Sequence, residues 1–330
     1  MLRSLVGSEM CIRDRLIYDN FSRGNIENIR KSLEDDRCKI YPNGGDIRDL
    51  DLLNEAMNGI DGVIHLAAMW LLHCKDFPRT AFHVNIEGTF NVLEACVKNN
   101  IKRLVYSSSA SVYGDAVETP MTEKHPFNNR NFYGATKIAG EAMCKAFHDR
   151  YGLSYVGLRY MNVYGPYQDQ TAAYTGVIPI MLNKIDINEQ PVINGDGSQA
   201  YDFIDAEDAG RCNLLALESN MSDEFYNVGT GVQTSIKELC DTILEIKNSD
   251  LVVLCPVYAA GEKVDKSYKL GSLSQRTTLF DTPVLAIEET ITFRAGLVTE
   301  AGQPVASNKL TTKYVVFELG VKVIGPRPFV

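Results

Sequence analysis

The sequence has no excess of positive charge and no long apolar run, and each absence excludes a class of protein. It carries 33 Lys and Arg against 42 Asp and Glu, a net charge of −9, so it lacks the basic surface that binding to a nucleic acid requires. No run of roughly 18 apolar residues is present, so we predict no membrane-spanning helix. The first residues, MLRSLVGSEMCIRDR, also lack the apolar stretch of a secretory signal.

The eight cysteines form no cluster, because none lies in a C-x-x-C pair and the histidines beside them, such as His73 before Cys74, stand alone. A zinc site needs ligands at short spacing, so we predict no metal. Scattered cysteines inside apolar patterns are typical of small core residues in a reduced compartment. We therefore expect a cytoplasmic protein.

What is present is a regular alternation of short apolar runs with amphipathic segments, starting near residue 16. The runs LIYD, KIYPNGGDI, VIHLAA, RLVYSSS and YVGLRY predict strands, and the segments between them predict helices. Strands separated by helices of this length need right-handed crossovers, so they form a mostly parallel sheet covered on both faces. The predicted fold class is α/β, a doubly wound parallel sheet of the Rossmann type with a smaller C-terminal substrate lobe.

The chain divides into four segments on this interpretation. Residues 1–15 fit no element and resemble a non-native leader, and residues 16–166 form the dinucleotide-binding domain. Residues 167–250 form a smaller lobe. Residues 251–330 are threonine-rich and β-like, match nothing that precedes them, and suggest a chimera.

Asp19 ends the strand LIYD, where dinucleotide-binding folds place an acidic residue that accepts hydrogen bonds from a ribose. Its charge would repel a 2′-phosphate, which favours NAD over NADP. The glycine-rich phosphate loop should precede this acid by about 20 residues. Only Gly7 lies upstream, so either Asp19 is a plain turn residue or the first strand and its loop are missing. The second alternative predicts weak NAD binding and exposed edges on the neighbouring strands.

Tyr133 and Lys137 lie four residues apart in Y-G-A-T-K, and so on one face of a predicted helix. A nearby ammonium favours the phenolate and would lower the high pKa of a tyrosine, which makes the pair suited to proton transfer. Ser107 to Ser109 end the preceding strand, at the edge where parallel sheets bind ligands. Alone, Y-x-x-x-K is a weak signal, but the serine cluster strengthens it.

From residue 16 to about residue 245 the chain resembles the extended short-chain dehydrogenase/reductase family. The nearest branch is the NAD-dependent nucleotide-sugar epimerases and dehydratases of the UDP-glucose 4-epimerase type, here without the N-terminal strand. The motifs that carry the resemblance are LIYDNFSRG, GDIRD, VIHLAA, VNIEGTFNVLEA, SSSASVYG, YGATK, LRYMNVYGP, GDGSQAYDF and YNVGTG.

The resemblance implies an NAD cofactor, a homodimer and a set of site residues. The implied catalytic residues are Ser109, Tyr133 and Lys137. The implied cofactor-binding residues are Asp19 and Asn20 for the adenosine ribose, Asp46 and Ile47 for the adenine, and Leu66, Ala67, Ala68, Asn85, Ser107, Tyr133, Lys137 and Tyr160 for the rest. Ser109, Tyr133, Asn162 and Tyr201 are expected to contact the substrate.

Two departures from the family pattern bear on the reaction. Dehydratases resemble S-T-D-E-V-Y-G at the serine strand, whereas this chain has Ala110 and Ser111 in place of the two acids, which favours epimerisation over loss of water. Tyr201 stands where epimerases usually carry an arginine for the substrate diphosphate. An NAD-linked dehydrogenase or reductase, or a truncated fragment without activity, therefore stays open.

Trp70, the single tryptophan, is followed by His73 and Cys74 in a segment that also departs from the family pattern. These side chains either line the substrate pocket or belong to the core.

Overall fold

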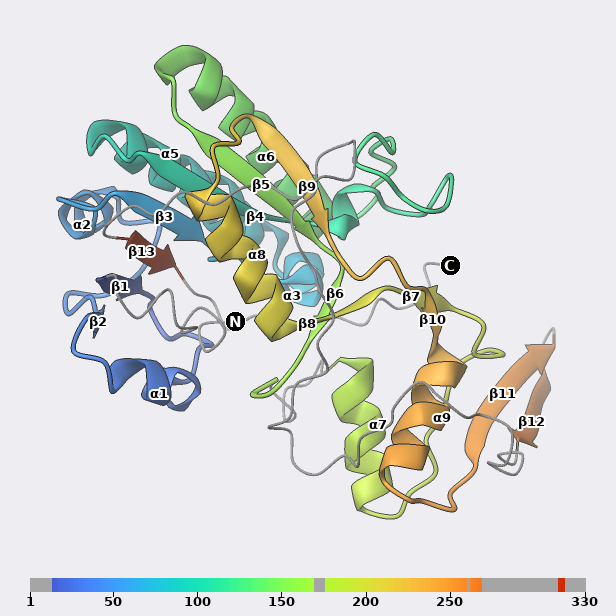
Figure 1. The fold of residues 1–330 in the computed structure, drawn as a ribbon. Helices are drawn as coiled ribbons and strands as arrows, with labels where there is room; N and C mark the ends of the chain where they lie inside the picture. Colours follow the sequence, from blue (N-terminus) through green and yellow to red (C-terminus); the bar gives the residue numbers. More distant parts are fainter. Residues whose placement is uncertain (1–13, 169–175, 260–261, 269–313, 318–330) are drawn as a thin grey trace. The chain divides into compact units, whose positions relative to one another are not determined.

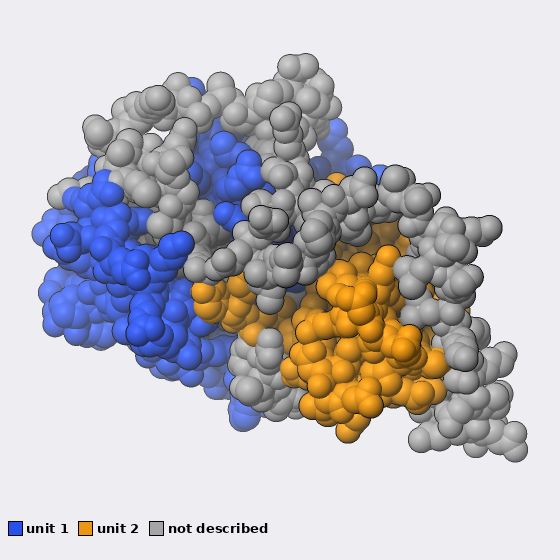
Figure 2. Space-filling view, turned by 60° about the horizontal axis from the view of Figure 1, so that its bottom comes forward, with its two compact units in different colours: residues 1–165, 204–229, 294–322 blue, residues 166–203, 230–293, 323–330 orange. Residues whose placement is uncertain are grey.

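The computed structural model describes residues 14–168, 176–259, 262–268 and 314–317. The chain forms two compact units (Figure 2). The first unit contains residues 1–165, 204–229 and 294–322, and the second contains residues 166–203, 230–293 and 323–330.

The first unit is built on a seven-stranded sheet in which every neighbouring pair of strands is parallel. The strands in spatial order are β2 (Cys38–Ile40), β1 (Arg15–Tyr18), β13 (Tyr314–Phe317), β3 (Gly62–His65), β4 (Arg103–Ser109), β5 (Tyr155–Tyr160) and β9 (Glu224–Val228). All residues of β3 and β5 are buried, as expected for strands covered on both faces. The predicted doubly wound α/β fold is confirmed.

Helices cover both faces of this sheet (Figure 1). Leu53 of α2, Met57 at the end of α2, Leu93 of α5, and Cys144 and Phe147 of α6 share one core with the strands. Helix α8 contacts β3, β4 and β5 and crosses the other face. The helical segments of this unit are η3 (Ile26–Ile29), α1 (Arg30–Leu33), α2 (Leu50–Ala56), α3 (Leu71–Asp76), α4 (Pro78–Ala81), η4 (Phe82–Gly88), α5 (Thr89–Lys98), η5 (Ala110–Val112), α6 (Phe132–Tyr151) and α8 (Ala206–Glu218).

Strand β13 occupies the sheet position that a first strand takes in the dinucleotide-binding order 3-2-1-4-5-6. Val316 lies opposite Ile17 of β1 on one side and opposite Ile64 of β3 on the other. The facing edges of β1 and β3 are therefore paired, and the expectation that they are exposed is wrong for the described residues. The sequence pattern could not reveal this, because parallel pairing across about 300 residues leaves no local signal.

The local sequence of α6 determines how it reaches the sheet. The side chain of Asn131 accepts a hydrogen bond from the Gly134 amide and caps the first turn, and Gly152 ends the helix in a left-handed conformation. A Cβ at Gly140 would lie 1.9 Å from the Tyr106 hydroxyl oxygen. Only glycine allows α6 to approach β4 this closely, and this approach brings Tyr133 and Lys137 to the end of β4.

The second unit has a small core of its own, formed by Met181, Ile185, Cys240, Ile243 and Leu244 with their neighbours. Its helices are α7 (Val177–Asp186) and α9 (Ile236–Ile246), the latter begun by a capping box between Ser235 and Glu238. The remaining short strands of the chain are β6 (Asn162–Tyr164), β7 (Ala200–Tyr201), β8 (Phe203–Asp205), β10 (Thr234–Ser235), β11 (Val253–Ala259) and β12 (Glu262–Tyr268). Among the helices of the described ranges, none combines the length and apolarity that crossing a membrane requires.

Candidate active site

The serine-rich end of β4 and the first two turns of α6 meet, as the sequence predicts. Lys137 is 5% exposed, and its Nζ donates a hydrogen bond of 2.6 Å to the backbone oxygen of Ser107. The same Nζ lies 5.7 Å from the centre of the Tyr133 ring. Tyr133, Lys137 and the three serines thus belong to one cluster.

Burial sets the protonation behaviour of this cluster. It lowers the pKa of Lys137 to about 8 and raises the pKa of Tyr133 above its ordinary value. A hydrogen bond from Ser109 opposes the rise at Tyr133. The expectation that Lys137 lowers the pKa of Tyr133 below the ordinary value is therefore wrong for this geometry: removal from water outweighs the effect of the ammonium, which is directed at Ser107.

Ser109 is oriented by its neighbour Ser111. The Ser109 hydroxyl oxygen accepts one hydrogen bond from the Ser111 amide at 3.2 Å and a second from the Ser111 hydroxyl at 2.8 Å. With both lone pairs occupied, the Ser109 hydroxyl has only its own hydrogen to offer. Ser109 therefore acts as a donor toward Tyr133 or a bound hydroxyl.

Tyr160 lies beside this cluster at the end of β5. Its hydroxyl donates to Asn213 of α8 at 2.7 Å and lies 3.4 Å from the Ser107 hydroxyl. Burial raises the pKa of Tyr160, so the phenol stays protonated. Tyr160 therefore fixes β5 to α8 next to Lys137.

Asp19 lies directly after β1, at its carboxyl end, and is 6% exposed. Its carboxylate accepts a hydrogen bond of 2.7 Å from the Phe21 amide, and burial raises its pKa to about 6. Asn20 is exposed, and its side chain accepts from the Ser22 amide. The structure thus provides a buried carboxylate beside β13, where a ribose acceptor is expected.

Two other predicted cofactor contacts have partners in the protein. Asp46 holds Arg48 through both carboxylate oxygens, and this ion pair lowers the pKa of Asp46. Ile47 is buried and lies close to Gly88, where a Cβ would be 2.6 Å from the Ile47 side chain. Ile47 therefore packs against the helical segment η4.

Asn85 braces the loop that follows β3. Its side-chain oxygen accepts from the Met69 amide at 2.5 Å, and its nitrogen donates to the Met69 oxygen at 2.9 Å and to Thr136 at 3.0 Å. Leu66, Ala67 and Ala68 lie in the segment that this brace holds after β3. Asn85 thus fixes this loop to α6, next to Lys137. Any contact of Asn85 with a cofactor stays a prediction.

Trp70 and Cys74 are buried, at 9% and 0% exposure, and belong to the core of the first unit. The Arg23 guanidinium stacks 3.5 Å from the centre of the Trp70 ring, and His73 packs edge-on against the same ring. The Cys74 thiol donates to the Met69 oxygen. Sequence analysis did not find Arg23 or Thr136, although Thr136 lies inside the Y-G-A-T-K motif.

Besides Ser109 and Tyr133, the other two predicted substrate contacts belong to different units. Asn162 begins β6 in the first unit, and Tyr201 ends β7 in the second, where its ring packs 6.2 Å from Phe203. Their contact with a substrate stays a prediction. In the described part of the chain, no group of three or more His, Cys, Asp or Glu side chains is arranged to hold a metal ion.

A parallel α/β sheet with Ser, Tyr and Lys side chains gathered at the carboxyl ends of its strands is typical of enzymes that bind a dinucleotide. Residues 16–229 match the model of the NAD dependent epimerase/dehydratase family. The chain belongs to this family of NAD-dependent enzymes.

Relatives and solved structures agree with this assignment. A Methanocaldococcus jannaschii protein, provisionally named a UDP-glucose 4-epimerase, is 39% identical over 234 residues, which is 70% of this chain and 73% of the relative. The UDP-N-acetylglucosamine 4-epimerase of Methanobrevibacter ruminantium M1, solved with UDP-N-acetylmuramic acid, is 35% identical with a TM-score of 0.69, covering 75% of this chain and 78% of that one. The dTDP-glucose 4,6-dehydratase DesIV of Streptomyces venezuelae, solved as a double mutant with NAD and DAU bound, is 26% identical with a TM-score of 0.69, covering 77% and 80%.

Proposed function

We propose that the chain is an NAD-dependent epimerase of a nucleotide sugar, acting by transient oxidation of a ring hydroxyl. The observation that carries the proposal is the Ser109–Tyr133–Lys137 cluster, in which the positions next to Ser109 are Ala110 and Ser111 rather than carboxylates. Elimination of water needs an acid and a base at the substrate, and these two positions supply neither. Reversible oxidation needs a group that moves the hydroxyl proton, which this cluster offers, and a hydride acceptor, which NAD would supply.

Residues of the first unit fit two parts of an NAD cofactor, the adenosine ribose and the nicotinamide ribose. Asp19 is a buried carboxylate with a raised pKa at the carboxyl end of β1, suited to accept hydrogen bonds from ribose hydroxyls. Lys137 and Tyr133 would lie at the nicotinamide ribose, with Asn20, Asp46, Ile47 and the segment 66–68 completing the site. When bound, NAD supplies the hydride acceptor and donor.

In its phenolate form, Tyr133 would take the proton of the reacting hydroxyl at its phenol oxygen and later return it. Ser109 donates a hydrogen bond to this oxygen or to the sugar, which stabilises negative charge as it develops. Lys137, whose pKa is about 8, would supply positive charge 5.7 Å from the centre of the Tyr133 ring while the phenolate exists. The three residues thus hold and move a single proton.

The direct test is incubation of the purified chain with NAD and UDP-glucose or another UDP- or dTDP-sugar. We expect the 4-epimer of the sugar with no net NADH. Tyr133→Phe should lower the rate by at least about 100-fold, whereas exposed Tyr151→Phe should leave it unchanged.

Other products would contradict the proposal in distinguishable ways. Net NADH would indicate a dehydrogenase, and a 4-keto-6-deoxy sugar would indicate a dehydratase. No turnover, together with no response to NAD, would indicate a fragment without activity.

We further propose that the chain acts as a cytoplasmic homodimer built on α5 and α6. Phe90 and Tyr151 are 41% and 57% exposed and both contact Phe147, forming an aromatic patch across the two helices. The expected particle mass is twice the chain mass of 36.7 kDa. Light scattering should show this mass, and the Phe90→Glu/Tyr151→Glu variant should halve it. An unchanged mass in the variant would exclude this surface.

A further inference from the structure

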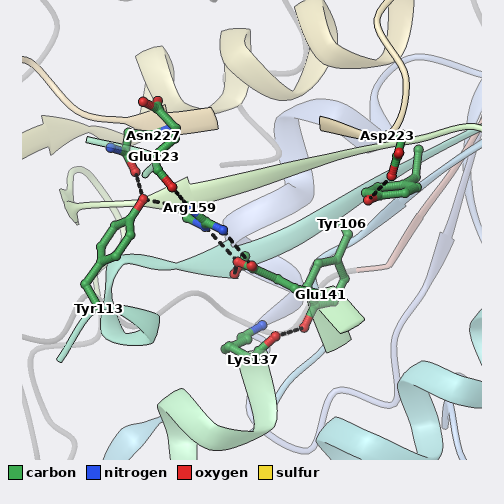
Figure 3. A network of polar contacts seen from close by, with 10 residues as sticks. Tyr106, Tyr113, Glu123, Lys137, Glu141, Arg159, Asp223 and Asn227 are labelled. Atoms are coloured by element: carbon green, nitrogen blue, oxygen red, sulfur yellow. Dashed lines mark hydrogen bonds and ion pairs between the residues drawn. The ribbon is translucent and has the colours of Figure 1, made fainter. Parts of the chain in front are cut away.

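A buried ion pair joins the catalytic helix to the sheet. The side chains of Glu141 on α6 and Arg159 on β5 are 3% and 5% exposed. Arg159 binds both carboxylate oxygens, through Nε at 2.8 Å and Nη2 at 2.7 Å (Figure 3). The Ser108 hydroxyl donates a third hydrogen bond to Glu141, at 2.5 Å. The carboxylate is thus held from two strands at once.

Two members of this contact, Glu141 and Ser108, are sequence neighbours of the proposed catalytic residues. Glu141 lies four residues after Lys137 on the same helix, and Figure 3 shows the two side chains one turn apart. Ser108 lies between Ser107, whose backbone binds Lys137, and Ser109. The Glu141 carboxylate therefore determines how α6 is placed against the end of β4.

The third guanidinium nitrogen of Arg159, Nη1, is also held by hydrogen bonds. Its Nη1 donates to the Tyr113 hydroxyl at 2.9 Å and to the Glu123 backbone oxygen at 3.0 Å. Tyr113 in turn donates to the Asn227 side chain at 2.6 Å. The backbone amide of Asn227 donates to the Glu123 carboxylate. The network shown in Figure 3 leaves Arg159 little freedom to follow a displaced Glu141.

Glu141 also contributes negative charge near Lys137. The titratable and charged groups near Lys137 and Glu141 are Cys74 on α3, His65 on β3, Tyr106 on β4, Tyr155 and Arg159 on β5, Tyr113 after η5, and Tyr133 and Cys144 on α6. Burial raises the pKa of every thiol and phenol in this set and lowers that of His65 to about 3, so all of them are neutral at pH 7. Cys74, Glu141 and Cys144, in that order, raise the pKa of Lys137; because burial raises the pKa of the two thiols, the Glu141 carboxylate is the one of the three that carries negative charge at pH 7.

We propose that Glu141 and Arg159 are positioning residues that hold α6 against β4 and balance the charge beside Lys137, so that its ammonium keeps its proton at working pH. The catalytic meaning of this proposal rests on the proposed function. Its electrostatic content does not, because the charge state of Lys137 is measurable without substrate.

The test follows the titration of Lys137 by NMR in protein labelled with 13C-lysine, using the signal that Lys137→Met removes. Glu141→Gln takes away the negative charge, so the titration midpoint should fall by about 0.5–1 pH unit. Arg159→Met leaves the carboxylate facing Lys137 alone, so the midpoint should rise. The opposite signs are the signature, because a pair with a purely structural role would move the midpoint in neither variant.

Two further variants keep the test decisive where a single substitution prevents folding. The double variant Glu141→Gln/Arg159→Met removes both charges and avoids an unpaired buried ion, and its midpoint should fall. Arg159→Lys keeps the charge, and its midpoint should equal that of the wild type. The matched control is Arg103→Met, at the other end of β4, where the arginine donates to the backbone oxygens of Ser219 and Met221. An unchanged midpoint in both Gln-containing variants, or shifts of the same sign in Glu141→Gln and Arg159→Met, would overturn the proposal.

The epimerase assay separates this proposal from the proposed function. If both are correct, the alkaline limb of kcat shifts with the NMR midpoint in each variant. Opposite NMR shifts without any epimerase activity would refute the proposed function and leave the charge balance intact. Epimerase activity without NMR shifts would refute the charge balance alone.

Discussion

Asp19 shows how burial changes a side chain that the sequence places correctly. Its carboxylate is nearly inaccessible and accepts one backbone hydrogen bond, and the loss of water outweighs that bond, so its pKa rises to about 6. An ionised carboxylate accepts hydrogen bonds from ribose hydroxyls through both oxygens, and these bonds are stronger than those to a protonated carboxyl group. Cofactor binding should therefore depend on pH in a range where ordinary aspartates are fully charged.

We predict that NAD affinity weakens as the pH falls below about 6, by roughly tenfold per pH unit once Asp19 is mostly protonated. Fluorescence of Trp70, which lies in the same unit, provides the measurement. Asp19→Asn should bind weakly with no such pH dependence, and exposed Asp51→Asn should behave as the wild type. A constant affinity between pH 5 and 7 would contradict the assignment of Asp19.

Lys137 makes the stability of the fold depend on pH, because burial disfavours its charged form. Its pKa is 10.5 in the unfolded chain and about 8 in the folded chain, so between these values the unfolded state binds more protons. The cost of burying the ammonium is complete below pH 8 and disappears above pH 10.5.

We therefore predict that replacing Lys137 by Met favours the folded state more at neutral pH, where the wild type buries an ammonium, than at high pH, where it does not. The difference in free energy of unfolding between the two proteins should change in favour of the wild type as the pH rises from 7 to 9.5. Urea denaturation at several pH values measures this, with exposed Lys98→Met as the control. A difference that is independent of pH would show that Lys137 titrates normally.

At the scale of elements, the segment between α4 and α5 departs from a regular helix. Residues Phe82–Gly88 form a π-helical turn, a feature often found at functional sites. Asn85 lies in this turn and is 2% exposed, with its side chain bound to both backbone groups of Met69. The turn thus connects the loop after β3 to α6.

We predict that Asn85→Leu lowers the free energy of unfolding by roughly 2–4 kcal/mol, because it leaves the buried polar groups of Met69 without their partner. Urea denaturation measures the loss. Exposed Asn58→Leu should change the stability by less than about 0.5 kcal/mol. Equal stabilities of the two variants would show that the Asn85 hydrogen bonds contribute nothing net.

At the scale of the whole molecule, the first unit joins parts of the chain that are far apart in sequence. Strand β13, near the C-terminus, pairs with β1 near the N-terminus and with β3. It is an interior strand with a hydrogen-bonded neighbour on each side. An interior strand tolerates proline poorly, since proline donates no backbone hydrogen bond.

We predict that Val316→Pro destabilises the first unit by about 2 kcal/mol or more, whereas Val316→Ile, which keeps the amide, leaves its stability close to that of the wild type. The readout is the midpoint of urea unfolding followed by circular dichroism. A wild-type midpoint for Val316→Pro would mean that β13 contributes nothing to the stability of the sheet.

Much of the first unit was predictable from local pattern. Short apolar runs predict β1 to β5, the Y-G-A-T-K spacing places Tyr133 and Lys137 on one helix face, and the serine run places Ser109 at a strand end. Each of these inferences depends on residues close together in sequence, where helix and strand periodicity apply. The family assignment follows from the order of these motifs.

Contacts between distant segments were not predictable, because nothing local encodes them. The sequence by itself determined the fold class and which Ser, Tyr and Lys residues gather at the end of β4. Only the tertiary structure decided that β13 fills the sheet between β1 and β3, that Arg159 is the partner of Glu141, and that burial rather than the neighbouring ammonium dominates the pKa of Tyr133. The physical reason is the same in each case: desolvation and long-range pairing depend on what surrounds a residue in space, which appears only once the chain has folded.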